Sequence, residues 1–128
     1  MEKRKVLLID DEPHVISVLK HFLIKSGYEV DTASNGFEAL QKVEKQMPDA
    51  IVSDIQMPKM SGLEFSQQFR SDFAESDSLI IIMTSRTEQD FRDKAGTLEN
   101  VEFFEKPLSP KKMVIRLKKY FEEMECSA

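Results

Sequence analysis

The chain has little cysteine and no tryptophan. Its single cysteine, Cys126, lies near the C-terminus, so an internal disulfide and a cysteine metal cluster are both excluded. A lone cysteine fits a reducing compartment. No apolar run approaches the ~18 residues needed to span a bilayer, and the first residues do not have the pattern of a signal peptide. We therefore expect a cytoplasmic protein without membrane insertion.

Internal repeats, low-complexity segments and linkers are also absent, and neither sign of charge is in large excess. The net charge of −5 argues against direct binding of nucleic acid. Apolar residues make up 41% of the chain and charged residues 32%, which is typical of a globular protein rather than a disordered one. Because 128 residues are close to the usual domain size, we expect a single domain over residues 1–128.

Helix and strand signals alternate along the chain. Short apolar runs bounded by turn residues predict strands at about 6–9, 29–33, 50–54, 79–83 and 101–104. Apolar residues at helical spacing predict helices from Pro13 to Gly27, from Phe37 to before Pro48, after Ser61, from about Glu88 to Ala95, and after Pro110. This alternation favours an α/β fold of the (βα)5 type, with a parallel sheet covered by helices on both faces.

Polar residues stand where four of the predicted strands end. Asp54 ends one apolar run, Asp10 and Asp11 follow the first strand, Thr84 follows the fourth, and Lys106 comes after the last. The carboxyl ends of parallel strands lie along one edge of a sheet, where open α/β sheets bind their ligands. We therefore expect three acids, a hydroxyl and a lysine to converge on one site.

The three carboxylates favour a divalent cation. Like charges held close together raise one another's pKa, and a hard cation relieves that conflict. Mg²⁺ often takes one or two carboxylates together with water and phosphate oxygens. We expect Asp11 and Asp54 to be direct ligands and Asp10 to hold a metal-bound water. The main-chain carbonyl of Gln56 is a further protein ligand in this hypothesis.

A carboxylate beside such a cation can also act as a nucleophile and form an aspartyl phosphate. The transferred phosphoryl group spreads its charge over three oxygens, so catalysis consists mainly of positioning and neutralisation. Mg²⁺ would neutralise one oxygen, the ammonium of Lys106 a second, and the hydroxyl of Thr84 the third. The site thus has the groups needed to accept a phosphoryl group on Asp54.

The motifs at these strand ends resemble those of the receiver domain of two-component response regulators. The residues that carry the resemblance are Asp10-Asp11, Asp54-Ile55-Gln56-Met57-Pro58-Lys59-Met60-Ser61-Gly62, Met83-Thr84-Ser85 and Lys106-Pro107. Each motif alone is weak, but four in this order at strand ends are specific. The resemblance extends from about Lys5 to Glu123, which leaves a short C-terminal tail. It implies a flavodoxin-like, doubly wound fold with strand order 2-1-3-4-5.

The resemblance also implies a role for each site residue. Asp54 would be the phosphoacceptor, Asp10 and Asp11 the acidic pair for Mg²⁺, and Lys106 the phosphate-binding lysine. Thr84 would be the switch hydroxyl. Two further features follow from the family. Phe103 stands where relatives carry the switch aromatic, and the Lys106–Pro107 peptide bond would be cis.

The expected activity is a signalling switch rather than an enzyme, beyond self-catalysed phosphoryl acceptance and autodephosphorylation. The phosphoryl donor would be a sensor histidine kinase, a phosphotransfer protein or a small acyl phosphate. Phosphorylation would remodel the surface of the fourth helix, last strand and last helix for a downstream protein target or output domain. A dimer that forms on phosphorylation is a further partner consistent with the family.

Two features depart from the family pattern, and two further positions vary within the family. Relatives usually have glycine shortly before the last strand, whereas the segment here is Ala95-Gly96-Thr97-Leu98-Glu99-Asn100. Phe103 lacks the hydroxyl that a tyrosine would carry. Gln56 and Arg86 occupy variable positions that tune phosphoryl lifetime in the family.

Other functions fit the sequence less well. A haloacid-dehalogenase-type enzyme needs a second acid two residues after its nucleophile, and Gln56 stands there. A flavodoxin-like electron carrier needs a phosphate loop rich in Ser, Thr and Gly after the first strand, whereas Asp10-Asp11-Glu12-Pro13 would repel phosphate without a metal. A nucleotide-binding domain is disfavoured because neither GxGxxG nor GxxxxGK[ST] occurs. The more serious alternative is a receiver fold that serves as a phosphorylation-independent interaction module.

Overall fold

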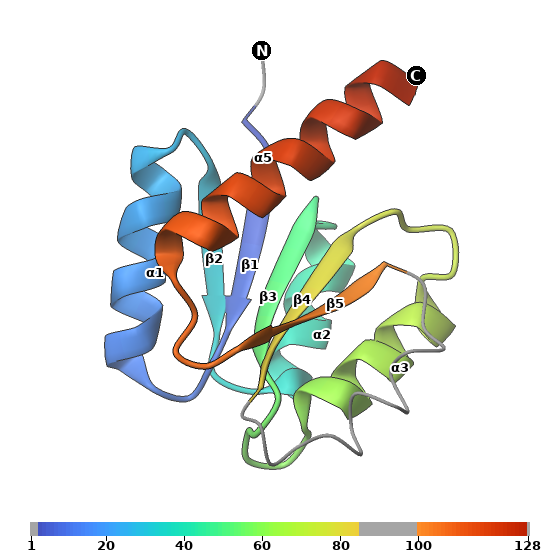
Figure 1. The fold of residues 1–128 in the computed structure, drawn as a ribbon. Helices are drawn as coiled ribbons and strands as arrows, with labels where there is room; N and C mark the ends of the chain where they lie inside the picture. Colours follow the sequence, from blue (N-terminus) through green and yellow to red (C-terminus); the bar gives the residue numbers. More distant parts are fainter. Residues whose placement is uncertain (1–2, 85–99, 128) are drawn as a thin grey trace.

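The computed structural model describes residues 3–84 and 100–127 (Figure 1). Five parallel strands form one sheet in the order β2-β1-β3-β4-β5, which confirms the predicted flavodoxin-like topology. The strands are β1 (Lys5–Ile9), β2 (Glu29–Ala33), β3 (Ala50–Asp54), β4 (Leu79–Thr84) and β5 (Val101–Glu105). Their carboxyl ends all lie at the same edge of the sheet.

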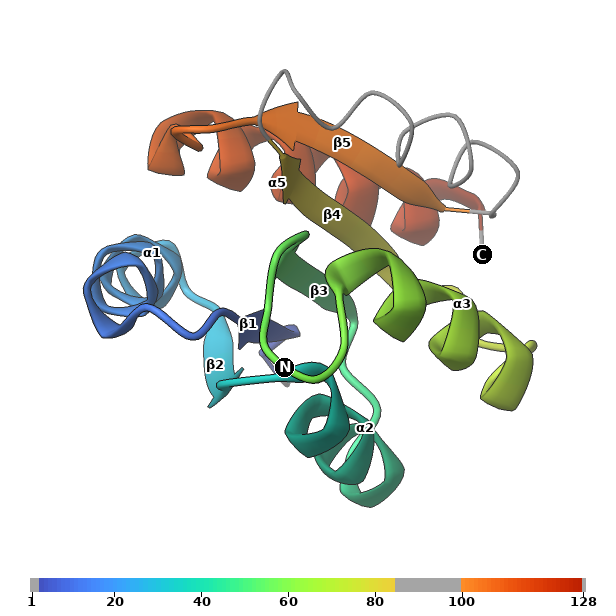
Figure 2. The same ribbon diagram turned by 90° about the horizontal axis from the view of Figure 1, so that it is seen from below.

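Helices cover both faces of the sheet. The described helices are α1 (Pro13–Lys25), α2 (Gly36–Lys45), α3 (Gly62–Asp72) and α5 (Pro110–Ser127). Seen along the strands, α1 and α5 lie on one side and α2 and α3 on the other (Figure 2). The helix predicted from Glu88 to Ala95 lies outside the described residues. None of the helices described is both long and apolar enough to span a membrane.

The sheet separates two apolar cores. Alternate residues of a strand point to opposite faces, so Val6 and Leu8 pack with α1 and α5, whereas Leu7 and Ile9 pack with α2 and α3. Every residue of β3 and β4 is buried. This is why the central strands read as continuous apolar runs rather than as an alternating pattern.

The helix starts follow local chemistry. The hydroxyl of Ser61 accepts a hydrogen bond from the main chain of Glu64, whose carboxylate accepts one from the main chain of Ser61. This capping box begins α3 directly after the loop that follows Asp54. In α2, the side chain of Asn35 accepts from the Glu38 N–H in the same way. The loops at the carboxyl edge are therefore held where the helices begin.

Asn100 precedes β5 in an unusual backbone conformation. Its φ of 54° lies in the left-handed region, which asparagine tolerates better than most side chains. Its carbonyl accepts a hydrogen bond from the Ile80 N–H, 2.8 Å away, at the start of the β4–β5 pairing. Asn100 therefore leads into β5 in a left-handed conformation. The rest of the segment in which the family usually has glycine, Ala95 to Glu99, lies outside the described residues.

Candidate functional site

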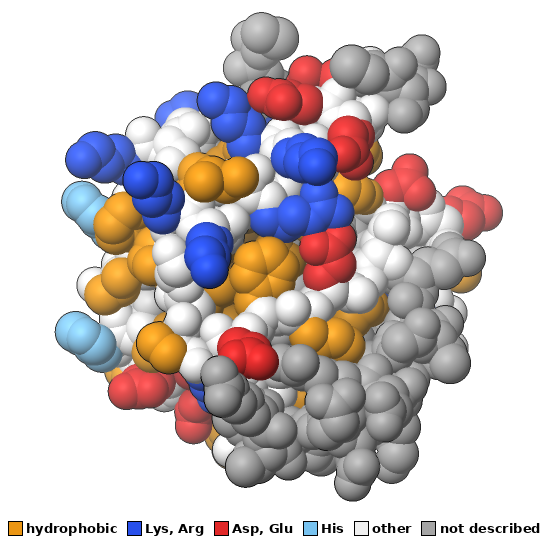
Figure 3. Space-filling view, in the orientation of Figure 1, with side chains coloured by type: hydrophobic (Ala, Val, Ile, Leu, Met, Phe, Trp, Pro, Cys, Tyr) orange, Lys and Arg blue, Asp and Glu red, His pale blue; other side chains and the backbone are white. Residues whose placement is uncertain are grey.

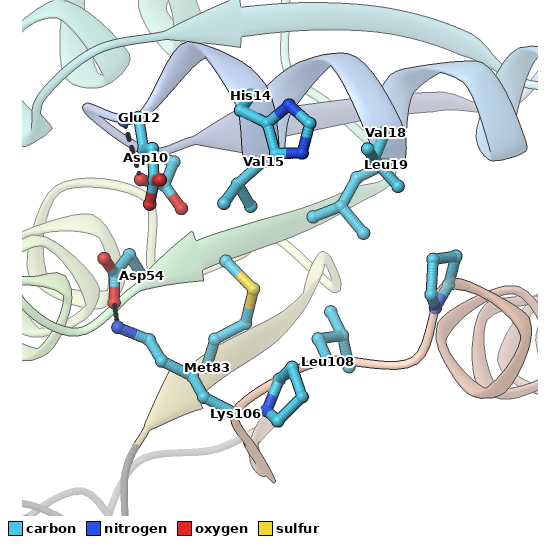
Figure 4. A pocket seen from close by; sticks show the side chains of 12 residues that line it. Asp10, Glu12, His14, Val15, Val18, Leu19, Asp54, Met83, Lys106 and Leu108 are labelled. Carbon is cyan, nitrogen blue, oxygen red and sulfur yellow. Dashed lines mark hydrogen bonds and ion pairs between the residues drawn. The ribbon is translucent and has the colours of Figure 1, made fainter.

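Asp54 is the last residue of β3, and its side chain meets a lysine from the end of β5. The residue is 7% exposed. The Nζ of Lys106 lies 2.5 Å from Asp54 Oδ1, as Figure 4 shows. The same oxygen accepts a hydrogen bond from the main-chain N–H of Gln56 at 3.3 Å. Residues 52 positions apart in the chain are thus joined at one carboxylate.

Asp10 and Asp11 bring two further carboxylates to Asp54. One oxygen from each of the three acids lies within 4.8 Å of the others. Asp10 is 6% exposed, and its Oδ1 accepts a hydrogen bond from the Glu12 N–H at 2.9 Å. Asp11 is exposed. Oxygen donors this close fit a hard divalent cation such as Mg²⁺.

The acidic cluster carries an electrostatic cost in the absence of a cation. Burial raises the pKa of Asp10 to about 6, and the charges of Asp54 and Asp11 act in the same direction. The Glu12 N–H and the Lys106 ammonium oppose this shift but do not cancel it. A bound cation would favour the ionised carboxylate. The chemistry of the donors therefore fits the metal that the sequence predicted.

Thr84 and Phe103 lie on β4 and β5, the two strands that follow β3 in the sheet order. Thr84 ends β4 and is fully buried, and its carbonyl accepts a hydrogen bond from the Lys106 N–H at 2.8 Å. Phe103 is partly buried and packs against the core on the side of α2 and α3. Their switch roles stay predictions, as does the metal role of the Gln56 carbonyl. Ser85 and Arg86 lie outside the described residues.

The loop after β5 contributes to an apolar cavity beside the carboxylates. The Lys106–Pro107 peptide bond is cis. The cavity has a volume of about 420 Å³ and reaches from Asp10, Asp54 and Lys106 to α1 (Figure 4). Its apolar lining includes Val15, Val18, Leu19, Met83 and Leu108. The sequence analysis used the apolar residues of this segment only to predict a helix, and it predicted no cavity beside it.

Gly62 is a second feature that sequence reasoning missed. A Cβ at this position would stand 2.3 Å from the carbonyl oxygen of Asp54 and 3.0 Å from the Cα of Ile55. Both of these neighbouring atoms belong to the main chain and cannot turn away, so no side chain fits at this position. The Gly62 N–H donates to the Ile55 carbonyl at 2.8 Å. The one sequence feature that could have indicated this close contact is a glycine at the start of a helix, four residues after Pro58.

Comparisons with known proteins agree with this geometry. The model of the response regulator receiver domain family matches residues 6–118. The alkaline phosphatase synthesis transcriptional regulatory protein PhoP of Bacillus subtilis (strain 168) is 36% identical over 127 residues, which cover 98% of this chain and 51% of that protein. The probable transcriptional regulator ycf27 of Guillardia theta is 38% identical over 116 residues, 91% of this chain and 44% of the relative.

Solved structures give the same result. The chemotaxis response regulator CheY4 of Vibrio cholerae has a TM-score of 0.83 and 31% identity, covering 92% of this chain and 98% of its own. A receiver domain protein from Clostridium thermocellum has a TM-score of 0.84 and 25% identity, covering 98% of this chain and 99% of its own. The chain spans about half the length of the curated relatives it matches. It belongs to the response regulator receiver domain family.

Proposed function

We propose that this protein is a phosphorylation-activated switch that accepts a phosphoryl group on Asp54. The observation that carries the proposal is the convergence on that carboxylate of one ammonium, from Lys106 at 2.5 Å, and two further acids suited to a cation. A nucleophilic carboxylate with fixed positive charge around it is what phosphoryl transfer requires.

In the proposed reaction an oxygen of Asp54 attacks the phosphorus atom of the donor. A new O–P bond forms while the bond from phosphorus to the donor breaks, and the donor leaves with that electron pair. Lys106 Nζ neutralises charge on one transferred oxygen, and the buried Thr84 lies on the adjacent strand to receive another. In autodephosphorylation, water attacks the phosphorus atom, the bond between phosphorus and the Asp54 oxygen breaks, and phosphate is released. The free carboxylate of Asp54 is restored, and no separate substrate is turned over.

Mg²⁺ is the cofactor in this proposal. Asp10, Asp11 and Asp54 would hold it, with the Gln56 carbonyl as a further ligand, and it would supply charge neutralisation for the phosphoryl oxygens. The raised pKa of Asp10, about 6, supports a site that is incomplete without a cation.

The response to phosphorylation is proposed as a shift between two states. The phosphoryl group would draw Thr84 towards it, and the ring of Phe103 would move into the vacated space. The surface of β5, α5 and the predicted fourth helix would then change for its partner. A shift from 1:99 to 99:1 requires about 5.5 kcal/mol of preference for the active state.

The surface beside the site suits a protein donor. Segments 13–28 and 107–121 contain no acidic residue, although the whole chain has a net charge of −5. Their basic residues are Lys20, Lys25, Lys111, Lys112, Arg116, Lys118 and Lys119. Figure 3 shows Lys and Arg side chains next to hydrophobic ones over α1 and α5. Val18 and Phe22 of α1 are 39% and 40% exposed. An acidic, partly apolar donor surface would complement this face.

We therefore propose a sensor histidine kinase or phosphotransfer protein as donor, and a cytoplasmic location. Residues 1–128 would act as one domain that controls a downstream protein target or output domain, without itself contacting nucleic acid or inserting into a membrane. A dimer formed on phosphorylation is one route to that control. The alternative is a phosphorylation-independent interaction module, which would use the same fold with no need for the Asp54–Lys106 pair.

The proposal is tested by intact mass after incubation with acetyl phosphate and Mg²⁺, with Asp54→Asn as control. We expect one phosphoryl adduct that is absent without Mg²⁺ and absent from the variant. If the wild-type protein gains no adduct and binds neither Mg²⁺ nor beryllofluoride, the interaction-module function is the better one. An adduct that persists in Asp54→Asn would mean that the acceptor lies elsewhere.

A further inference from the structure

The main chain of Asp54 is held by a buried hydroxyl from the residue before it. Ser53 is fully buried, and strand alternation points its side chain to the same face as Ile51 and Ile55, which pack with α2 and α3. Its Oγ donates a hydrogen bond to the carbonyl oxygen of Asp54 at 2.8 Å. The reactive carboxylate of Asp54 lies on the opposite side of the strand, with Lys106.

The same carbonyl is also confined by α3. A Cβ on Gly62 would stand 2.3 Å from it, so the first turn of α3 packs directly on the Asp54 peptide. A second fully buried serine, Ser66, donates its hydroxyl to the Gly62 carbonyl at 2.8 Å. The position of α3 and the direction of the Asp54 peptide are therefore coupled through these contacts.

Asp54 needs this support because it stands where the sheet ends. The pairing of β1 with β3 stops at Ile9 and Ser53, whereas β4 continues to pair through Met83 with Asp54. A peptide that has lost one neighbouring strand has more freedom to rotate. Rotation of the Asp54 peptide would turn its side chain relative to Lys106 Nζ, which the ion pair now holds at 2.5 Å.

We infer that Ser53 is a positioning residue for phosphoryl acceptance, and this inference rests on the function proposed above. Its hydroxyl fixes the Asp54 carbonyl, and through it the direction in which the Asp54 carboxylate meets the donor. Ser53 touches neither the phosphoryl group nor the cation. Loss of the Ser53 hydroxyl lowers the rate of the chemical step, because a small misplacement of a reacting group slows a reaction strongly.

A matched control is available at the opposite edge of the sheet. Ser78 is also buried, 4% exposed, and its hydroxyl also donates to a main-chain carbonyl, that of Pro48. Ser78 immediately precedes β4, far along the strand from Asp54. Ser53→Ala and Ser78→Ala each remove one buried hydroxyl-to-carbonyl hydrogen bond, and Ser78→Ala also removes the oxygen that accepts a hydrogen bond from the Ser76 hydroxyl at 2.9 Å. Ser78→Ala should therefore lower the melting temperature at least as much as Ser53→Ala, and only Ser53→Ala should affect the chemistry.

The experiment measures phosphorylation by acetyl phosphate at saturating Mg²⁺, as maximal rate and half-saturating concentration, in wild type, Ser53→Ala, Ser53→Thr and Ser78→Ala. We expect Ser53→Ala to lower the maximal rate about 10-fold with an unchanged half-saturating concentration. Ser78→Ala should stay within about 2-fold of wild type, and Ser53→Thr, which keeps the donor, should recover most of the rate.

Two results would overturn the inference while leaving the proposed function intact. One is a wild-type maximal rate in folded Ser53→Ala. The other is an equal slowing of Ser53→Ala and Ser78→Ala at equal loss of melting temperature, which would assign the effect to stability. Absence of phosphorylation in the wild-type protein would instead remove the proposed function itself, and the positioning role with it.

Discussion

Lys106 Nζ lies 2.5 Å from Asp54 Oδ1 and joins the carboxyl ends of β5 and β3. The lysine side chain is 38% exposed, whereas that of the aspartate is 10% exposed. The pair therefore has one buried, charged partner and one that can move. This combination suits the proposed reaction, in which the Asp54 carboxylate reacts first and the Lys106 ammonium then follows the transferred phosphoryl group.

Replacing the lysine should impair phosphoryl acceptance. In Lys106→Met the phosphoryl oxygen that the Lys106 ammonium would neutralise loses its protein partner, and removal of one such donor typically slows a reaction by about 10²-fold. We expect a loss of one to two orders of magnitude, about 10–100-fold, in the rate with acetyl phosphate. Lys119→Met, an exposed lysine on α5, is the control and should leave the rate unchanged. A normal rate in Lys106→Met would exclude Lys106 from the chemistry.

The stability of the metal-free protein should fall as pH rises. Asp10 has a pKa of about 6 in the folded protein against an ordinary value of 3.8. Between these values the folded state keeps a proton that the unfolded state has released, so folding becomes less favourable towards pH 6 and stays so above it. The full shift corresponds to up to about 3 kcal/mol.

Asp10→Asn should therefore stabilise the metal-free protein, and more at pH 7.5 than at pH 4.5. Urea unfolding in EDTA at the two pH values measures the difference. An equal gain at both pH values would show that the ionisation of Asp10 is not the cause. Mg²⁺ should stabilise the wild-type protein at pH 7.5 and have little effect on the variant, because the site has lost a charged oxygen.

A methyl group at Gly62 should be costly because it meets backbone. Gly62→Ala would bring Cβ to 2.3 Å from the Asp54 carbonyl oxygen, and relief requires a shift of β3 or α3. We expect a loss of about 1–3 kcal/mol in the free energy of unfolding, together with slower phosphorylation. Thermal and urea unfolding measure the first effect and acetyl phosphate kinetics the second.

Gly36→Ala provides the comparison for Gly62. There the added Cβ would meet the Sδ, Cγ and Cβ of Met60 at 2.6, 2.9 and 3.0 Å. These are side-chain atoms, so a turn of the Met60 side chain with a small shift of its Cβ relieves the contact. Gly36 is also the first residue of α2, where alanine gains less than it does in a helix interior. Gly36→Ala should cost less than Gly62→Ala. Equal losses in the two variants would contradict the distinction between a backbone and a side-chain contact.

Asn100 should accept glycine but not other side chains. At a φ of 54°, Asn100→Gly removes backbone strain at the expense of two long side-chain hydrogen bonds, to Asp77 at 3.5 Å and Tyr120 at 3.4 Å. Its effect on unfolding should be small. Asn100→Ala should lose about 1 kcal/mol. Equal stabilities of the glycine and alanine variants would argue against a left-handed turn.

Much of the fold was readable from local patterns. The apolar runs of β3 and β4 predicted buried strands because both faces of a central parallel strand are covered. The carboxylates of Asp10, Asp11 and Asp54 were predicted to meet because parallel strands end at one edge. The strand order was predicted only from the family resemblance, because the spacing of apolar residues and the composition do not indicate which strands are neighbours in the sheet.

The sequence predicted which residues form the site, but not their burial, their distances or the contacts around them. Nothing near Asp10 in the chain indicates that it is 6% exposed, and its raised pKa follows from that burial. The apolar cavity escaped prediction because Val15 and Val18 have the same spacing as core residues. The confinement of Asp54 by Gly62 depends on the approach of a helix to a strand end, which no local pattern records.

By itself, the sequence determined the element types, the two-faced burial of the central strands and the chemical inventory of the site. These depend on side-chain period, backbone propensity and residue type, which are local properties. Tertiary structure alone decided that Lys106 pairs with Asp54, that Asp10 is buried, and that the Asp54 carbonyl is held by Ser53 against Gly62. Those contacts join segments that are far apart in the chain, and the segments come together only when the two apolar cores pack.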